Sequence, residues 1–219
     1  MIFNVTHTTK YEYNAPVSYC HNIATLRPRE SKGQELLDYK IQITPEPAEI
    51  SERIDFFGNF ITRFSIQTEH KILKVTTKSK IKREYAQYHE LFNSAGCSGI
   101  TMNDALFALK GMSPEILEAK QYTLESIFIR RTDKNIRETL PAPGKKKLVG
   151  ADASHAWFAI FIPGFGWVDF DPTNNQIPKD QHIVVGWGRD YYDVPPLKGV
   201  VYGSGQSTLK VAVDIAAVV

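Results

Sequence analysis

Apolar and polar residues alternate with a period of two along the first part of the chain. Three runs carry the pattern: Phe3, Val5, His7, Thr9, Tyr11 and Tyr13; Leu37, Tyr39, Ile41 and Ile43; Phe60, Thr62, Phe64 and Ile66. Such alternation is typical of strands with one buried face and one solvated face. Proline- and glycine-containing breaks separate the runs, so residues 1–80 are predicted to form an N-terminal antiparallel β-sandwich-like domain.

The pattern changes after this region. Ser113-Pro114-Glu115 has the form of a helix start, with an N-cap residue, a proline in the first turn and an early acid. A second short helix is expected from Met102 to Leu109. Residues 81–136 are therefore predicted to form a helical connector.

Strand-like patterns return near the C-terminus, after a basic loop at residues 137–150. Strands are expected at His155–Ile162, Trp167–Asp171, Asp180–Gly186 and Ser207–Ile215, and residues 163–166 are predicted to form a turn between the first two. The expected fold class is α+β.

The charge balance limits the classes of partner. The 219 residues include 26 basic and 24 acidic side chains, for a net charge of +2. A net charge this close to zero excludes a strong electrostatic case for binding nucleic acid or an anionic membrane. The apolar stretch Val211–Val219 is short and is interrupted by Asp214, so it is a poor membrane span.

The cysteine count points to a reduced compartment. Two cysteines, Cys20 and Cys97, do not make a disulfide scaffold, and the chain opens without a secretory leader pattern. A cytoplasmic location is expected. The histidines lack metal-ligand spacing and no phosphate-binding glycine loop is present, so we expect neither a metal nor a cofactor.

The most informative candidates for chemistry are His155 and Asp171. If their strands form a hairpin with Asp171 opposite Trp157, Asp171 is a diagonal neighbour of His155 on the same face. A carboxylate that fixes an imidazole allows the imidazole to act as a general base and then as a general acid. A pair that only ties the hairpin together is the alternative, and a register shift of one residue would separate the two side chains.

The residues around this pair resemble the C-terminal half of the bacterial transglutaminase-like proteins, which are often described as cysteine proteases. The matching segments are Ser154-His155-Ala156-Trp157, Pro163–Trp167, Phe170–Asn174, His182-Ile183, Gly186–Asp190, Val194–Gly199 and Thr208–Val213. The N-terminal region also resembles the β domain that precedes this core, at Tyr11–Val17, Leu26–Arg29, Asp55–Asn59 and His70–Val75.

The resemblance implies a papain-like core with a Cys–His–Asp triad. His155 then corresponds to the catalytic histidine and Asp171 to the carboxylate that orients it. Residues 137–219 would be the remainder of this core together with the C-terminal strands.

The sequence departs from the family at the nucleophile. No segment resembles the helix that begins with the family's cysteine, and a block of several dozen residues is expected to be missing at the junction Ile136–Arg137. Cys97 precedes a predicted helix, and a helix N-terminus activates a thiol, so Cys97 is the candidate substitute. Cys20 is expected to be structural.

Other side chains near the pair have two possible roles. Trp157 and Trp167 either pack in the core or shape a substrate groove. Asp169 shares the strand face of Asp171 and either polarises the site or faces solvent, whereas His182 is expected to be a strand residue outside the catalytic set.

The sequence supports two functional hypotheses. In the first, the chain is an enzyme that carries out acyl transfer or amide hydrolysis on a peptide or protein amide. In the second, it is a catalytically inactive or internally deleted family member that acts as a binding or scaffold module. Loss of a central helix would leave an apolar sheet face uncovered, so self-association or instability is expected.

Overall fold

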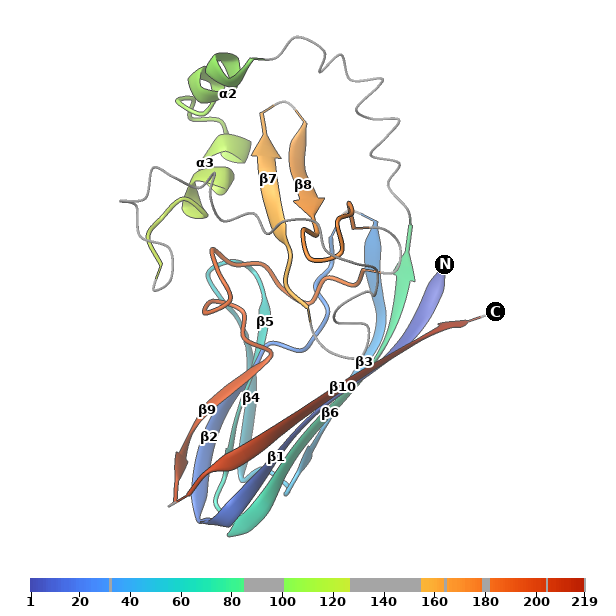
Figure 1. The fold of residues 1–219 in the computed structure, drawn as a ribbon, viewed down its shortest axis with the longest axis vertical. Coiled ribbons are helices and arrows are strands. Elements are labelled where there is room, and N and C mark those ends of the chain that lie inside the picture. Colours follow the sequence, from blue (N-terminus) through green and yellow to red (C-terminus); the bar gives the residue numbers. More distant parts are fainter. Residues whose placement is uncertain are drawn as a thin grey trace.

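The computed structural model describes residues 1–31, 33–84, 101–126, 155–163, 165–178, 182–203 and 205–218. These residues form β1 (Ile2–Val17), β2 (Tyr19–Ala24), β3 (Gln34–Thr44), β4 (Glu49–Ile54), β5 (Phe60–Ile66), β6 (His70–Arg83), α2 (Met102–Ala108), α3 (Pro114–Gln121), β7 (Phe158–Ile162), β8 (Gly166–Phe170), β9 (Leu197–Tyr202) and β10 (Ser207–Val218) (Figure 1).

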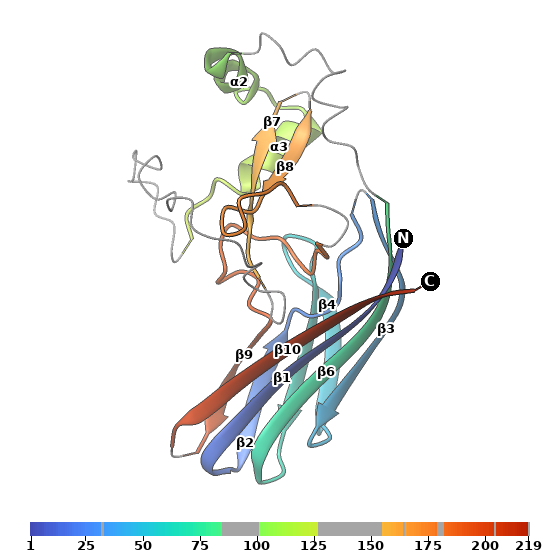
Figure 2. The same cartoon turned by 45° about the vertical axis from the view of Figure 1, so that its right-hand side comes forward.

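Two four-stranded antiparallel sheets pack face to face in the lower part of the molecule (Figure 2). One sheet has the strand order β10-β1-β6-β3 and the other has the order β4-β5-β2-β9. Along β1 the odd-numbered residues from Phe3 to Thr9 are buried, whereas their even-numbered neighbours are not. The period-two pattern therefore places one face of the strand toward the other sheet.

The main core lies between these two sheets. Phe64, Ile66, Leu73 and Val75 have at most 1% of their surface exposed and pack with Val17 and other apolar residues of both sheets. Burial of apolar side chains from both layers is the main favourable contribution to the stability of such a sandwich.

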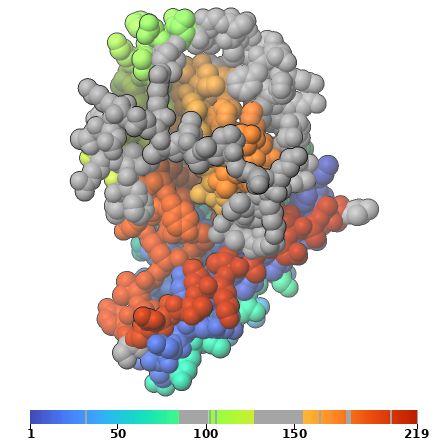
Figure 3. Space-filling view, viewed as in Figure 1, coloured from blue at the N-terminus to red at the C-terminus, as the bar shows by residue number. Residues whose placement is uncertain are grey.

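The C-terminal strands complete the two N-terminal sheets. β10 pairs with β1 from Ile2↔Val218 to Tyr13↔Ser207, and β9 pairs with β2 from Tyr19↔Tyr202 to Ala24↔Leu197. In the space-filling view, the red C-terminal strand lies across the blue N-terminal residues at the surface (Figure 3). The two ends of the chain are thus tied together in one β domain.

The two helices in the described part of the chain are short. α2 has seven residues and α3 has eight. α3 begins as the sequence predicts, because the Ser113 hydroxyl accepts a hydrogen bond from the backbone N–H of Ile116 and Pro114 follows in the first turn. Ile116 and Ala119 form its buried side.

The expected α+β fold class, with a helical connector and a papain-like core, is wrong. Strands dominate the described residues, and those of 155–218 contain no helix. The helix-start pattern at Ser113 is real but produces only two turns. The alternating C-terminal residues, which the resemblance placed with a core domain, instead continue the N-terminal sheets.

The strand expected at Asp180–Gly186 is also wrong for the residues described there. Residues 182–188 have no regular secondary structure. Their backbone hydrogen bonds go instead to the side chains of Gln34 and Asn59 in the β domain. Because these backbone donors and acceptors already have side-chain partners, the segment needs no neighbouring strand.

Among the helices that the structure describes, none has the length and apolar character needed to span a bilayer.

Candidate active site

The β7–β8 hairpin has the register that brings His155 and Asp171 together. Its residue pairs run from Phe158↔Phe170 to Ile162↔Gly166. Continuing this register by one residue places Trp157 opposite Asp171. Side chains two residues apart share one face of a strand. The imidazole Nε2 of His155 lies 2.9 Å from Oδ1 of Asp171, as the diagonal arrangement predicts.

Asp171 is buried, and its carboxylate is surrounded by hydrogen-bond donors. Its side chain has no exposed surface. The backbone N–H of Asn174 donates to Oδ1 at 3.1 Å, and the amide Nδ2 of Asn174 donates to Oδ2 at 2.7 Å. Burial raises the pKa of this carboxyl, but the bonds from Asn174 and His155 outweigh burial and lower the pKa of Asp171 to about 2. The group is therefore an anion at neutral pH.

The local sequence after β8 explains the placement of Asn174. Asp171 and Gln176 exchange two backbone hydrogen bonds, of 2.9 Å and 3.1 Å, which close the intervening turn. Asn175 adopts a positive φ of 51°, a conformation that asparagine tolerates better than most residues. Asn174 is thereby folded back onto the carboxylate that precedes it by three positions.

The contact with Asp171 fixes the protonation pattern of His155. A carboxylate only accepts hydrogen bonds, so Nε2 of His155 carries the hydrogen and the neutral ring has its lone pair at Nδ1. Nδ1 is thus the ring atom available to accept a proton. The His155 side chain is 18% exposed, so the ring is shielded but accessible.

A second imidazole reaches the same carboxylate, which the sequence did not predict. Nε2 of His182 lies 3.4 Å from Oδ2 of Asp171. His182 is 14% exposed and lies outside any strand. No residue spacing in the sequence indicates this contact, because it depends on how the 182–188 segment packs against the β domain.

Trp157 lies beside both imidazoles. Its ring centroid is 6.4 Å from that of His155 and 5.4 Å from that of His182, in an edge-on arrangement with the latter. The Trp157 side chain also forms a hydrogen bond with Asp169. Burial raises the pKa of Asp169, and this hydrogen bond opposes the effect.

Trp167 shares the face of Asp171 but lies away from the pair. Its position on β8 is four residues from Asp171, or roughly 13 Å along a strand. It packs edge-on against Phe161 and Tyr122, at centroid distances of 5.3 Å and 5.2 Å. Tyr122 stacks in turn on Phe57 of the β domain. Trp167 thus connects the hairpin to the rest of the fold.

Among the residues that the structure describes, no cysteine lies beside His155. Cys20 is fully buried in the sandwich, where Asn22 donates to its sulfur at 3.2 Å and the ring of His70 lies 3.7 Å away. Burial raises the pKa of the Cys20 thiol, so this cysteine is a poor nucleophile. Cys97, Ser154, the loop 137–150 and the junction Ile136–Arg137 lie outside the described residues.

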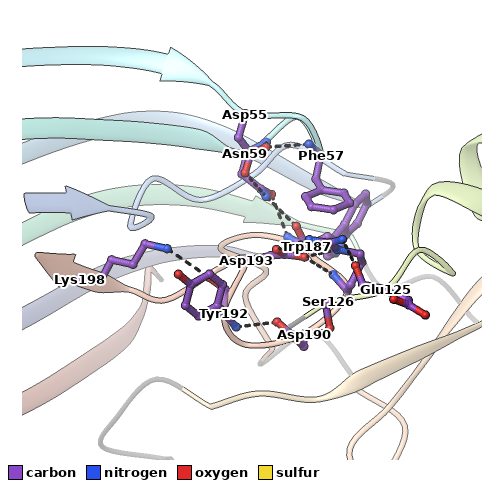
Figure 4. Close-up of polar contacts among 11 residues, drawn as sticks. Asp55, Phe57, Asn59, Glu125, Ser126, Trp187, Asp190, Tyr192, Asp193 and Lys198 are labelled. Carbon is purple, nitrogen blue, oxygen red and sulfur yellow. Dashed lines mark hydrogen bonds and ion pairs between the residues drawn. The ribbon is translucent and has the colours of Figure 1, made fainter. Parts of the chain in front are cut away.

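A buried polar cluster fixes the segment that carries His182 (Figure 4). Asn59 has no exposed surface, and its side chain donates to the carbonyl of Trp187 and accepts from the Trp187 N–H at 2.8 Å. Asp55 accepts from the Asn59 amide at 2.9 Å. Arg189 forms a two-point ion pair with Asp193, with both distances 2.9 Å. The sequence singled out Asp55–Asn59 by resemblance but gave no reason for it.

The described residues contain no group of three or more histidine, cysteine, aspartate or glutamate side chains arranged to hold a metal ion.

Comparison with known proteins identifies the N-terminal region. Residues 3–82 match the family described as the bacterial transglutaminase-like N-terminal region. The whole chain has the fold of a crystal structure from Cytophaga hutchinsonii titled a "Putative Cysteine Protease", with a TM-score of 0.56 and 16% identity over 99% of this chain and 90% of that one.

Uncharacterized proteins of Mycobacterium align over nearly all of the chain. One from Mycobacterium tuberculosis is 28% identical over 290 residues, which cover 97% of this chain and 92% of the relative. One from Mycobacterium leprae is 27% identical over 276 residues, covering 96% and 97%. Because this chain has 219 residues, at least 71 of the 290 aligned positions lie opposite gaps in it. Residues 3–82 thus match the bacterial transglutaminase-like N-terminal region, and the chain has the fold of the Cytophaga hutchinsonii protein.

Proposed function

We propose that His155 and Asp171 are the acid–base half of a Cys–His–Asp site that carries out acyl transfer or hydrolysis at a peptide or protein amide. The observation that carries the proposal is the 2.9 Å hydrogen bond from His155 Nε2 to the buried, ionised carboxylate of Asp171. This bond fixes the tautomer and the orientation of the imidazole.

Each step of the reaction has a defined proton balance. Nδ1 of His155 takes the proton from a thiol, and the thiolate attacks the carbonyl carbon of the amide. The C–N bond then breaks, His155 gives the proton to the departing amine, and an acyl thioester remains. Water or a second amine, deprotonated by His155, attacks the thioester and releases an acid or a new amide. The thiol regains its proton in this last step.

Cys97 is the thiol in this proposal. The chain has two cysteines, and Cys20 has no exposed surface and a raised pKa. A substrate therefore has no access to Cys20. Cys97 lies four residues before Thr101, whose hydroxyl caps the first turn of α2 by accepting from the N–H of Asp104.

A catalytically inactive binding or scaffold module is the second candidate function. Two observations favour it. The Mycobacterium tuberculosis relative has at least 71 aligned positions that this chain lacks. In addition, Phe158 and Ile160 on one face of β7 are 40% and 47% exposed. An uncovered apolar strand face is expected where an element that covers it in other proteins is missing.

Site-specific alkylation separates the two functions. The protein is treated with a limiting amount of iodoacetamide at mildly acidic pH, and the adducts are mapped by mass spectrometry. An ordinary thiol, with a pKa near ~8.5, reacts slowly there, whereas a thiolate paired with an imidazole reacts fast. We expect fast labelling of Cys97 that is lost in His155→Ala and retained in the control variant His21→Ala, which removes an exposed histidine of the β domain. Slow labelling, or labelling that His155→Ala leaves unchanged, contradicts the enzymatic function.

A further inference from the structure

We propose that His182 is a second positioning residue of this site, which holds the Asp171 carboxylate in place and thereby couples the site to the N-terminal β domain. The inference deepens the proposed function and rests on it for its catalytic meaning.

The two oxygens of Asp171 are divided between two imidazoles. Oδ1 accepts from His155 at 2.9 Å, and Oδ2 lies 3.4 Å from Nε2 of His182. Asn174 contributes one donor to each oxygen. Since a carboxylate is planar, donors on both oxygens fix its rotation about the Cβ–Cγ bond. A donor that fixes Oδ2 therefore also fixes the position of Oδ1 and the geometry of its hydrogen bond with His155.

The β domain determines where His182 lies. Two residues further along the chain, the N–H of Val184 donates to Oε1 of Gln34 at 2.9 Å, and the Gln34 amide donates back to the Val184 carbonyl at 2.8 Å. The N–H of Arg29 donates to the same carbonyl at 3.1 Å. Gln34 and Val184 are only 4% and 6% exposed. A buried two-way amide contact of this kind is costly to break.

The surroundings of His182 also restrict its ring. The Trp157 ring packs edge-on against it, with an interplanar angle of 86°. Asp169, on the same face of β8 as Asp171, interacts electrostatically with both His182 and Arg83. The imidazole thus lies near two carboxylates, of which Asp171 is the one within hydrogen-bond distance.

Paired substitutions of His182 separate a positioning role from a packing role. His182→Gln keeps a side-chain N–H donor, whereas His182→Leu keeps bulk and removes the donor. Two readouts are measured by NMR: the pKa of the Asp171 carboxyl, from its carbon-13 signal, and the downfield proton signal of His155 Nε2–H. The signals of the β-domain histidines His7 and His70 report whether each variant is folded.

The proposal predicts different results for the two variants. In His182→Leu the Oδ2 atom of Asp171 loses the imidazole donor that lies 3.4 Å away. A buried carboxylate with fewer donors favours its neutral form, so the pKa of Asp171 rises and the His155 Nε2–H signal is lost. In His182→Gln both readouts stay close to those of the unchanged chain. Unchanged readouts in His182→Leu, or equal changes in both variants, overturn the proposal.

Gln34→Leu provides a test that does not touch the site directly. It removes the contact with Val184, and we expect the His155 Nε2–H signal to be lost as in His182→Leu. If the variant is folded and the signal is retained, the coupling to the β domain is refuted.

These measurements need neither a thiol nor a substrate. Failure of Cys97 to react in the alkylation experiment therefore refutes the enzymatic function while leaving the positioning of Asp171 by His182 measurable. Conversely, a null result for His182 leaves the alkylation experiment unaffected.

Discussion

Asn174 holds both oxygens of Asp171, the residue three positions before it in the chain. Its backbone N–H donates to Oδ1 and its side-chain amide donates to Oδ2, at 3.1 Å and 2.7 Å. The segment Asp171–Asn174 therefore supplies a buried carboxylate together with the donors that keep it ionised. His155, which lies three residues before β7, donates to Oδ1 of the same carboxylate.

This arrangement predicts an acid-dependent loss of stability. The pKa of Asp171 is about 2 in the folded protein, against 3.8 for the unperturbed group. A carboxyl whose pKa is lowered by folding stabilises the protein above the unfolded pKa, and the contribution is lost as pH falls through the folded pKa. We expect about 2 kcal/mol of the free energy of unfolding to be lost between pH 4 and pH 2 through this group.

Urea unfolding at a series of pH values, on the unchanged chain and on Asp171→Asn, measures this contribution. Asp171→Asn cannot ionise, so its stability should be lower at neutral pH and should fall less steeply below pH 4. The same pH dependence in both proteins would show that Asp171 is not the group responsible.

Asn59 should be among the most sensitive polar positions of the fold. It has no exposed surface and bonds to Asp55, Trp187 and Arg29. Asn59→Ala leaves several buried donors and acceptors unsatisfied, so we expect the free energy of unfolding to fall by about 3 kcal/mol. Asn4→Ala, at an exposed position on β1, should change it by less than about 0.5 kcal/mol. Similar values for the two variants in urea unfolding would refute the anchoring role of Asn59.

Gly199 leaves no room for a side chain. A Cβ atom there would lie 2.1 Å from Oδ1 of Asn22 and 2.7 Å from the carbonyl oxygen of His21. Because the carbonyl belongs to the paired strand β2, relief requires the two strands to separate. Gly199→Ala should lower the free energy of unfolding by about 2 kcal/mol, while Val200→Ala, at an exposed neighbouring position, should change it little. Thermal unfolding of both variants checks this prediction.

The sequence was informative wherever local pattern alone decides the structure. The alternation from Phe3 to Tyr13 indicates β1, and the turn at residues 163–166 between two apolar runs indicates the β7–β8 hairpin. Given that hairpin, the contact between His155 and Asp171 depends only on the register and the period of two. This part of the candidate site was therefore predictable from residue spacing.

The remaining features depend on long-range packing. His182 reaches Asp171 because Gln34, 150 positions before Val184, holds the segment against the β domain. The last strand alternates like any other, and nothing in Leu209–Ile215 indicates that its partner is β1. The α+β class is wrong because the described helices are short and because the C-terminal strands, which the resemblance places in a core domain, pair with β1 and β2.

The exposed face of β7 predicts self-association. Phe158 and Ile160 point to the same side of the strand and are 40% and 47% exposed. Contact between two copies would remove this apolar surface from water. We expect sedimentation velocity to show concentration-dependent association of the unchanged chain, weakened in Ile160→Ser. The matched change Val200→Ser, at an exposed apolar position on β9, should leave association unaffected. A strictly monomeric protein at all concentrations would contradict this prediction.

The pH dependence of the Cys97 labelling rate, measured on the unchanged chain, His155→Ala and Asp171→Asn, tests whether His155 and Asp171 activate this thiol. If His155 and Asp171 activate this thiol, labelling of the unchanged chain continues well below pH 7. In both variants the labelling profile then shifts to that of an ordinary thiol, which becomes reactive near ~8.5. Three coincident profiles centred on that higher value would show that His155 and Asp171 do not activate Cys97.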